Sequence, residues 1–110
     1  MTEPALDERI RLALARHPSQ REVRMFGGLS FMVNDRMVAA ARSSGNLLVH
    51  VDPARSLELL SRPGARQAEM GAGRSMGPAW LEVERSVLSD QELDYWLLVA
   101  LSSSEAGNAD

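Results

Sequence analysis

The chain has 110 residues, a length typical of one domain, and we expect a single domain over residues 1–103 with a disordered tail over 104–110. It carries 15 acidic and 12 basic residues, and the resulting net charge of −3 disfavours direct binding to nucleic acid. The basic residues are all arginine and cysteine is absent, which excludes lysine Schiff-base chemistry, P-loop phosphate binding, disulfides and cysteine-ligated metals.

The N-terminal half is predicted to form one helix and three strands. Apolar residues at helical spacing indicate the helix, and alternating apolar residues indicate two strands. The second of these strands has Met37, Ala39 and Ala41 on one face. The third is apolar except for His50, which favours a central position in a sheet. The four elements are predicted over residues 4–16, 29–33, 36–42 and 47–51.

The C-terminal half is predicted to form a helix, two strands and a final helix. Asp52 is a suitable cap for the first of these helices and Pro53 suits its first turn. Ser89 and Glu92 form a capping-box pattern before an apolar stripe that reaches Leu101. The tail beyond it is small and polar and is expected to fray. The four elements are predicted over residues 53–62, 65–70, 79–84 and 89–101.

The resulting order, α-β-β-β-α-β-β-α, predicts an α+β fold. We expect two layers, a mostly antiparallel sheet of about five strands with helices packed on it. In the short segment before the first predicted strand, Gly27 and Gly28 follow Phe26. Consecutive glycines weaken a strand unless the backbone requires them. We therefore expect one of them to have a positive φ or to lie where another group approaches closely.

Two patterns invite a catalytic interpretation. Residues 73–77 match the G-x-S-x-G nucleophile motif, but that motif needs a following helix and a later histidine, and neither is predicted here. His50, Asp52 and Glu82 could meet after folding and form an acid–base group. Trp80 is predicted to share a strand face with Glu82, and with Arg74 and Met76 it could form a small binding surface. Alternatively, Trp80 covers a sheet edge.

Several short blocks, taken in order along the chain, resemble the TfoX/Sxy N-terminal domain family over roughly residues 5–101. The blocks are Arg24 to Gly28, Phe31 to Asn34, Val51 to Pro53, Met76 to Gly77 and Trp80 to Val83. The resemblance implies an α+β two-layer domain, similar in outline to YjbR-like domains and type III secretion chaperones. Its best-known members regulate natural competence with the cyclic-AMP receptor protein and carry a second, C-terminal domain. We expect this chain to be a stand-alone member without that domain.

Two classes of function follow. The first is a non-enzymatic interaction or regulatory module that binds a protein partner, with no cofactor and no metal. The alternative is a small-molecule binder or small enzyme that uses the region of Arg24, His50 and Trp80. The resemblance supplies no catalytic residues. The candidate binding residues are Arg24, Phe26, Gly27, Gly28, His50, Arg74 and Trp80.

The sequence also carries expectations about association and location. The residues from Trp96 to Leu101 are apolar without a break, and an apolar strip that one small sheet leaves exposed favours a symmetric homodimer. No apolar run is long enough to cross a membrane, and the acidic start differs from a secretory signal. We therefore expect a cytoplasmic protein.

Overall fold

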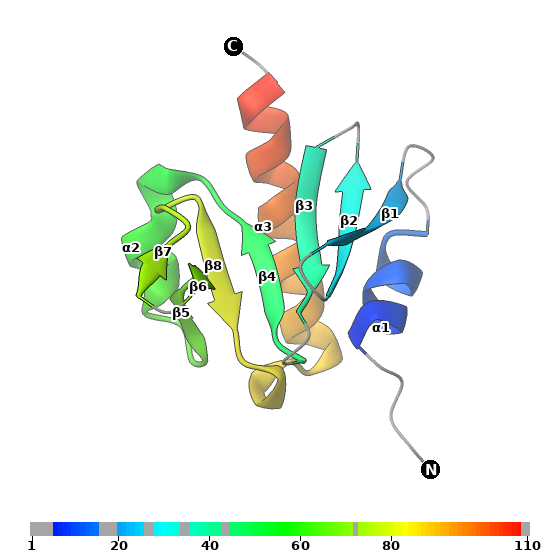
Figure 1. Ribbon diagram of the computed structural model, residues 1–110, viewed down its shortest axis with the longest axis horizontal. Helices are drawn as coiled ribbons and strands as arrows, with labels where there is room; N and C mark the ends of the chain where they lie inside the picture. The colour runs from blue at the N-terminus through cyan, green and yellow to red at the C-terminus, as the bar shows by residue number, and fades with distance from the viewer. Residues whose placement is uncertain are drawn as a thin grey trace.

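A computed structural model describes residues 6–15, 20–25, 28–33, 36–42, 45–71 and 73–108 of the chain (Figure 1). The regular elements in these residues alternate short strands with three α-helices and two 3₁₀ turns. In chain order the helices and strands are α1 (Leu6–Ala13), β1 (Arg21–Met25), β2 (Gly28–Val33), β3 (Arg36–Ala41), β4 (Leu47–His50), α2 (Ser56–Leu60), β5 (Ala65–Gln67), β6 (Glu69–Gly71), β7 (Arg74–Ser75), β8 (Trp80–Val83) and α3 (Asp90–Asn108).

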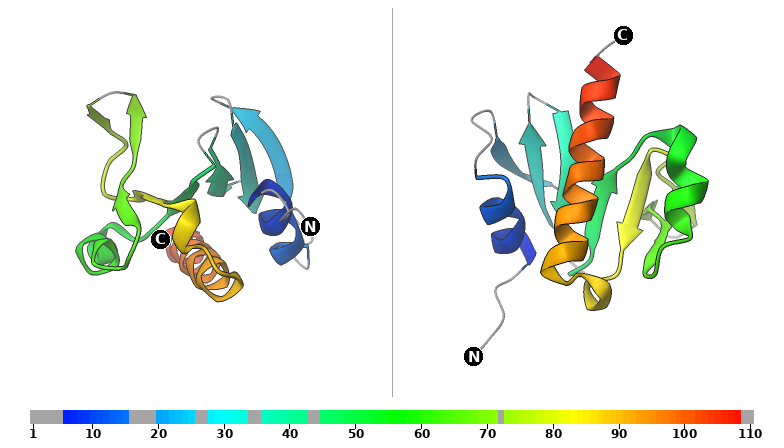
Figure 2. Two further views of the ribbon diagram at one scale, coloured as in Figure 1. Left: turned by 90° about the horizontal axis from the view of Figure 1, so that it is seen from below. Right: turned by 180° about the vertical axis from the view of Figure 1, so that it is seen from behind.

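Six strands form an open antiparallel sheet in the order β1-β2-β3-β4-β8-β5, and β6 pairs with β7 in a separate hairpin. All three helices lie on one side of this sheet, which we call the helix face (Figure 2). The opposite side is called the outer face. The predicted α+β, mostly antiparallel fold is confirmed, with six strands in the main sheet instead of about five.

The hydrophobic core lies between the helix face and the helices. Its largest fully buried side chains are Trp96 of α3, Phe31 of β2 and Ile10 of α1. Alternate residues of the central strands, such as Leu47 and Val49 of β4, point into the same core. Each large apolar side chain buried in this way contributes about 1.5–3 kcal/mol. The core therefore fixes which face of every strand meets the helices.

The predicted cap at Ser89 is confirmed for α3, and Asp52 caps the 3₁₀ turn Pro53–Arg55 that leads into α2. The Ser89 hydroxyl accepts a hydrogen bond from the Glu92 amide at 3.2 Å, and the Asp52 carboxylate accepts one from the Ala54 amide at 3.0 Å. The Glu92 carboxylate accepts a bond from Arg62, which follows α2, at 2.7 Å. The Arg62 guanidinium also lies 3.8 Å from the centre of the Tyr95 ring. These contacts hold the end of α2 against α3.

The main difference from the sequence analysis is β1, a strand that was not predicted. It pairs with β2 along its whole length and forms one edge of the sheet. Its apolar residues are only Val23 and Met25, too few for a clear alternating pattern, and Arg21, Glu22 and Arg24 are exposed. An edge strand can form from such residues because the neighbouring strand supplies the hydrogen bonds and little burial is needed.

The strand predicted over 65–70 is two strands in the structure. β5 continues the main sheet beside β8, whereas β6 pairs with β7. The break falls at Ala68, whose amide donates to the Trp80 carbonyl at 3.2 Å and whose carbonyl accepts from the Met76 amide at 2.9 Å. Ala68 therefore links the hairpin to the sheet, a role that propensity alone does not reveal.

The last helix also differs from the prediction. Its backbone is helical to Asn108, seven residues beyond the predicted end at Leu101, so the expected tail is regular up to that residue. Within the apolar run, Trp96, Leu97, Val99 and Ala100 are buried, and Leu98 is 65% exposed. The run therefore presents one exposed leucine and no continuous apolar strip.

A bulge in β3 changes which residues face the core. Phe31 pairs with Ala39 while Met32 pairs with Met37, so Val38 is an extra residue. Val38 and Ala39 both point into the core, and Met37 is turned to the outer face. The prediction that Met37 shares a face with Ala39 was wrong, because strict alternation does not continue through a bulge.

The expectation for the glycine pair is confirmed at Gly28, and Gly27 lies outside the described residues. A Cβ atom on Gly28 would clash with the carbonyl oxygen of Ala41 and lie 3.2 Å from the Cα of Arg42. Both neighbours are backbone atoms of the adjacent strand region and cannot turn away. Gly28 is therefore required so that the start of β2 can approach the end of β3.

Replacing Gly28 by valine should lower the free energy of unfolding by about 1–3 kcal/mol, because the new side chain collides with backbone. Chemical denaturation monitored by circular dichroism measures this change. Gly73→Asn is the matched control: Gly73 has a φ of +76° that asparagine tolerates, and no atom lies within 4 Å of the position of its Cβ. Equal stability of wild type and Gly28→Val would contradict the close approach.

Candidate functional site

The outer face carries a second, smaller apolar cluster. Ala40, Leu48 and Ala68 are buried there, and the partly buried side chains of Met37, Met76 and Trp80 pack around them. No described helix covers this face, as Figure 2 shows. We call the surface formed by Met37, His50, Met76 and Trp80 the outer patch. Methionine adapts its shape to a partner surface, and tryptophan is enriched among the residues that contribute most to binding.

His50 and Trp80 are brought together by strand pairing. They are directly opposite each other on β4 and β8. Their ring centroids are 4.9 Å apart with an angle of 73° between the planes, an edge-to-face contact. Such pairs contribute about 0.5–1.5 kcal/mol beyond the burial of their area. The contact fixes the orientation of Trp80 while leaving it half-buried.

Beside the outer patch, one carboxylate joins β8 to β5 and to two residues between β3 and β4. Glu82 on β8 accepts hydrogen bonds from Arg42 at 3.0 Å, from Asn46 at 2.7 Å and from Arg66 at 2.7 Å. Arg42 also donates to the Glu69 carbonyl at 2.8 Å. The Glu82 side chain is only 12% exposed, so these charge-assisted bonds are partly shielded from water.

Burial and hydrogen bonding act in opposite directions on Glu82. Desolvation is the largest influence and by itself would raise the pKa of Glu82, but the hydrogen bonds from Asn46 and Arg66 and the charges of Arg66 and Arg42 outweigh it. The net pKa of Glu82 is lowered, so the group is ionised in the folded chain at neutral pH.

Glu82→Gln should destabilise the fold by about 1–3 kcal/mol at pH 7, because an amide cannot neutralise two guanidinium groups. The folded pKa of Glu82 lies below the unfolded one, so its stabilisation is complete above about pH 4.3 and is lost as the pH falls through the folded pKa. Urea denaturation of the variant from pH 7 to pH 2.5 should therefore show a weaker acid dependence than wild type.

Glu84→Gln is the control for this measurement, since Glu84 follows the same strand and is exposed. Its stability should stay within about 0.5 kcal/mol of wild type at pH 7. Identical acid dependence in Glu82→Gln and wild type would show that the network does not stabilise the fold.

The surroundings of His50 disfavour the protonated, positively charged form of its imidazole. Burial is the main reason that the pKa of His50 is lowered; the charge of Arg36 lowers it further, and that of Asp52 partly offsets both. Its ordinary value is about 6.5, so His50 is neutral at pH 7. A neutral ring suits the edge-to-face contact with Trp80, because no charge has to be desolvated.

A titration of the His50 ring by NMR should test these causes separately. Arg36→Gln should raise the pKa of His50, since a repelling cation is removed. Asp52→Asn should lower it, and asparagine keeps the ability to cap the following 3₁₀ turn. Shifts in the opposite directions, or a pKa at or above 6.5 in wild type, would contradict this account.

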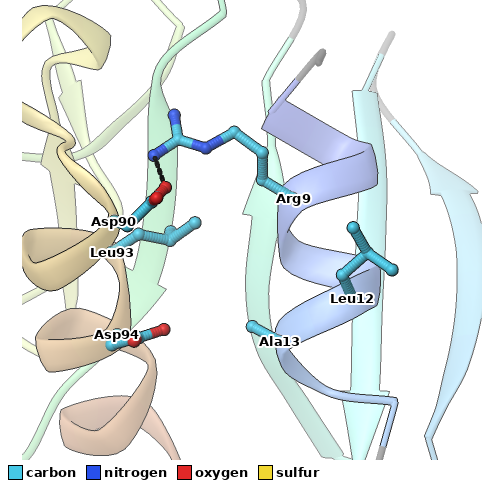
Figure 3. A pocket seen from close by; sticks show the side chains of 6 residues that line it. All are labelled: Arg9, Leu12, Ala13, Asp90, Leu93 and Asp94. Carbon is cyan, nitrogen blue, oxygen red and sulfur yellow. Dashed lines mark hydrogen bonds and ion pairs between the residues drawn. The ribbon is translucent and has the colours of Figure 1, made fainter. Parts of the chain in front are cut away.

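A separate pocket of about 490 Å³ lies between α1 and α3 on the helix side of the molecule (Figure 3). Arg9 crosses it and donates to the Leu88 carbonyl at 2.6 Å and to the Asp90 carboxylate at 3.3 Å. None of the candidate binding residues predicted from the sequence lines this pocket. The lining residues are Arg9, Leu12, Ala13, Asp90, Leu93 and Asp94.

The structure separates several of the predicted site residues. Arg24 is on β1, and three strands lie between β1 and β8 in the sheet order, a separation of four strand spacings or about 19 Å. Arg24 is also opposite the core residue Leu29 and so lies on the helix face, whereas Trp80 is on the outer face. Arg74 is exposed on β7. Phe26 lies outside the described residues.

Each member of the predicted group of His50, Asp52 and Glu82 has another contact in the structure. Glu82 is opposite Leu48 and is engaged by arginine and asparagine, His50 contacts Trp80, and the Asp52 carboxylate caps a turn. Ser75 of the G-x-S-x-G pattern accepts a hydrogen bond from the Gly77 amide at 3.0 Å within an exposed turn. The partners of Glu82 were missed because they are far from it in sequence.

Two further findings concern the described part of the chain. It contains no group of three or more histidine, aspartate and glutamate side chains placed to hold a metal ion. None of its helices has the length and apolar character needed to cross a bilayer.

Comparison with known proteins gives a family and a fold. The sequence matches the model of the TfoX N-terminal domain over residues 13–104. A crystal structure of a protein from Pseudomonas syringae, a structural genomics target, is similar with a TM-score of 0.62 and 12% sequence identity. The alignment covers 84% of this chain and 93% of that one. A comparison with curated proteins finds no match.

Proposed function

The chain belongs to the TfoX N-terminal domain family, and from this premise we propose that it is a non-enzymatic interaction module that binds a protein partner through the outer patch. The partner presents apolar side chains to Trp80 and Met76 and carboxylates to the exposed guanidinium groups of Arg66 and Arg74. The proposal places this role in the cytoplasm, in keeping with a chain that has no cysteine.

One observation carries the proposal: a sheet face without a described helix holds a half-buried tryptophan that its neighbours already orient. Tryptophan, methionine and arginine are enriched where proteins bind proteins, and a preoriented side chain loses little entropy on binding. Arg66 on β5 is 57% exposed despite its bond to Glu82, and Arg74 is exposed on β7 of the hairpin. An apolar centre with charged borders is the usual anatomy of a protein interface.

The regulatory part of the proposal comes from the family. Its best-known members act in transcriptional control of competence, and a module that contacts another protein could take part in such control without binding DNA. The net charge of −3 agrees with a protein partner better than with a nucleic acid.

A catalytic role is less well supported by the geometry. Catalysis needs groups with matched pKa values held within reach of one another. Arg24, His50 and Trp80 are not gathered at one place, and the pocket between α1 and α3 contains none of them. The carboxylates of Asp52 and Glu82, which could have formed an acid–base group with His50, accept hydrogen bonds from the Ala54 amide and from Asn46.

Affinity capture from native lysate, analysed for proteins and nucleic acids, should retain a protein with the wild-type chain. Trp80→Ala and Arg74→Glu should each reduce the captured amount at least about tenfold, since interface anchors of this kind typically contribute about 2 kcal/mol or more and about 1.4 kcal/mol corresponds to tenfold. Arg74→Glu keeps the fold intact because the side chain is exposed.

Leu57→Ser is the matched control, because Leu57 is 84% exposed on α2, on the helix side. It should capture the partner as wild type does. Capture that is unaffected by both outer-face variants, or lost in the control, would contradict binding through the outer patch. Broad substrate profiling with His50→Ala as control tests the catalytic alternative: turnover that disappears in this variant would overturn the non-enzymatic assignment.

A further inference from the structure

We propose that the β1 edge of the sheet binds a second copy of this chain, so that two six-stranded sheets join into one across a two-fold axis through Val23. Among the strands that the structure describes, β1 has a neighbour on one side only. The occupant is argued from the charges that this edge carries. The surface is distinct from the outer patch and does not depend on the proposed function.

The pairing of β1 with β2 determines which backbone groups point outward. Met25 is opposite Gly28 with two residues between them, the spacing of a two-residue hairpin in which the closing pair is hydrogen-bonded. In an antiparallel ladder such pairs alternate with pairs that do not exchange bonds. Val23 and Arg21 therefore face β2 with their backbone groups, and Glu22 and Arg24 direct theirs to the open edge.

These two outward residues are complementary to themselves. In an antiparallel pair centred on Val23, Glu22 of one copy lies opposite Arg24 of the other, and the reverse holds on the far side of the axis. Each such pair exchanges backbone hydrogen bonds and also sets opposite charges side by side. Both side chains are on the helix face, because Glu22 is opposite Phe31 and Arg24 is opposite Leu29 on β2.

The charges also disfavour the neighbouring registers. A shift that centres the pair on Glu22 places two carboxylates opposite each other, and one that centres it on Arg24 opposes two guanidinium groups. Like charges directly opposite in a sheet are destabilising. Of these three registers, only the one centred on Val23 places Glu22 opposite Arg24, with Arg21 opposite the uncharged Met25. In this register the helices of both copies lie on the same side of the joined sheet.

Glu22 is held in place for this contact by α1. Its carboxylate accepts two hydrogen bonds from Arg11, at 2.6 Å and 3.0 Å, one to each oxygen. Each carboxylate oxygen has a second lone pair, so Glu22 can accept from Arg24 of the second copy as well. The result is a row of alternating charges along the junction.

The experiment uses charge reversal in the full chain. Sedimentation equilibrium should show a wild-type dimer, and Glu22→Arg and Arg24→Glu should each weaken dimerisation at least about tenfold, because each places like charges opposite one another. A mixture of the two variants should form a heterodimer, which native mass spectrometry distinguishes by mass, since every facing pair is then opposite in charge. Circular dichroism establishes that both variants fold.

Amide hydrogen exchange of the wild-type chain provides a second readout that requires no variant. The amides of Glu22 and Arg24 should exchange rapidly in dilute solution and become protected at high concentration, whereas that of Val23 should be protected in both. A wild-type monomer at millimolar concentration, a mixture of variants that does not associate, or a dimer without protection at Glu22 and Arg24 would overturn the proposal.

Discussion

All three helices pack on one face of the sheet, and this one-sided burial is the constraint from which the other features follow. Trp96 of α3 is fully buried against that face, and the core-facing residues of β2, β3, β4 and β8 fill the remaining space. The alternate positions then point to a face that no described helix covers. Apolar residues at those positions must be shielded from water by other side chains. Met37, Met76 and Trp80 shield Ala40, Leu48 and Ala68 in this way.

The bulge at Val38 connects this constraint to the outer patch. Val38 and Ala39 both point into the core. Met37, the residue before Val38, is therefore turned to the outer face, although strict alternation from Ala39 would have placed it in the core. A single extra residue thus gives the core a valine and gives the outer face a methionine. Bulges commonly redirect a side chain in this way at sites of function.

Arginine links parts of the chain that are distant in sequence. Arg42 and Arg66 meet on Glu82, Arg62 joins Glu92 while lying over a tyrosine ring, and Arg9 reaches the Leu88 carbonyl. The planar guanidinium group has several donors, so one side chain can bind a carboxylate and a backbone carbonyl together, as Arg42 does. In a chain without lysine these contacts join strands, loops and helices.

The sequence by itself determined the features that depend on near neighbours. The caps at Asp52 and Ser89, the alternation in β2 and the apolar stripe of α3 all follow from contacts or packing preferences encoded locally. Together with the family blocks, they were sufficient for the α+β class, the antiparallel sheet and most element boundaries.

Only the tertiary structure decided the features that depend on pairing between distant segments. β1 forms because β2 offers it hydrogen bonds, not because its residues favour a strand. The contact of His50 with Trp80 depends on the register of β4 and β8, 30 residues apart, and Arg24 is excluded from it by strand order and by the face on which it lies. Register and strand order are set by the joint burial of the whole core, and no local pattern contains that information.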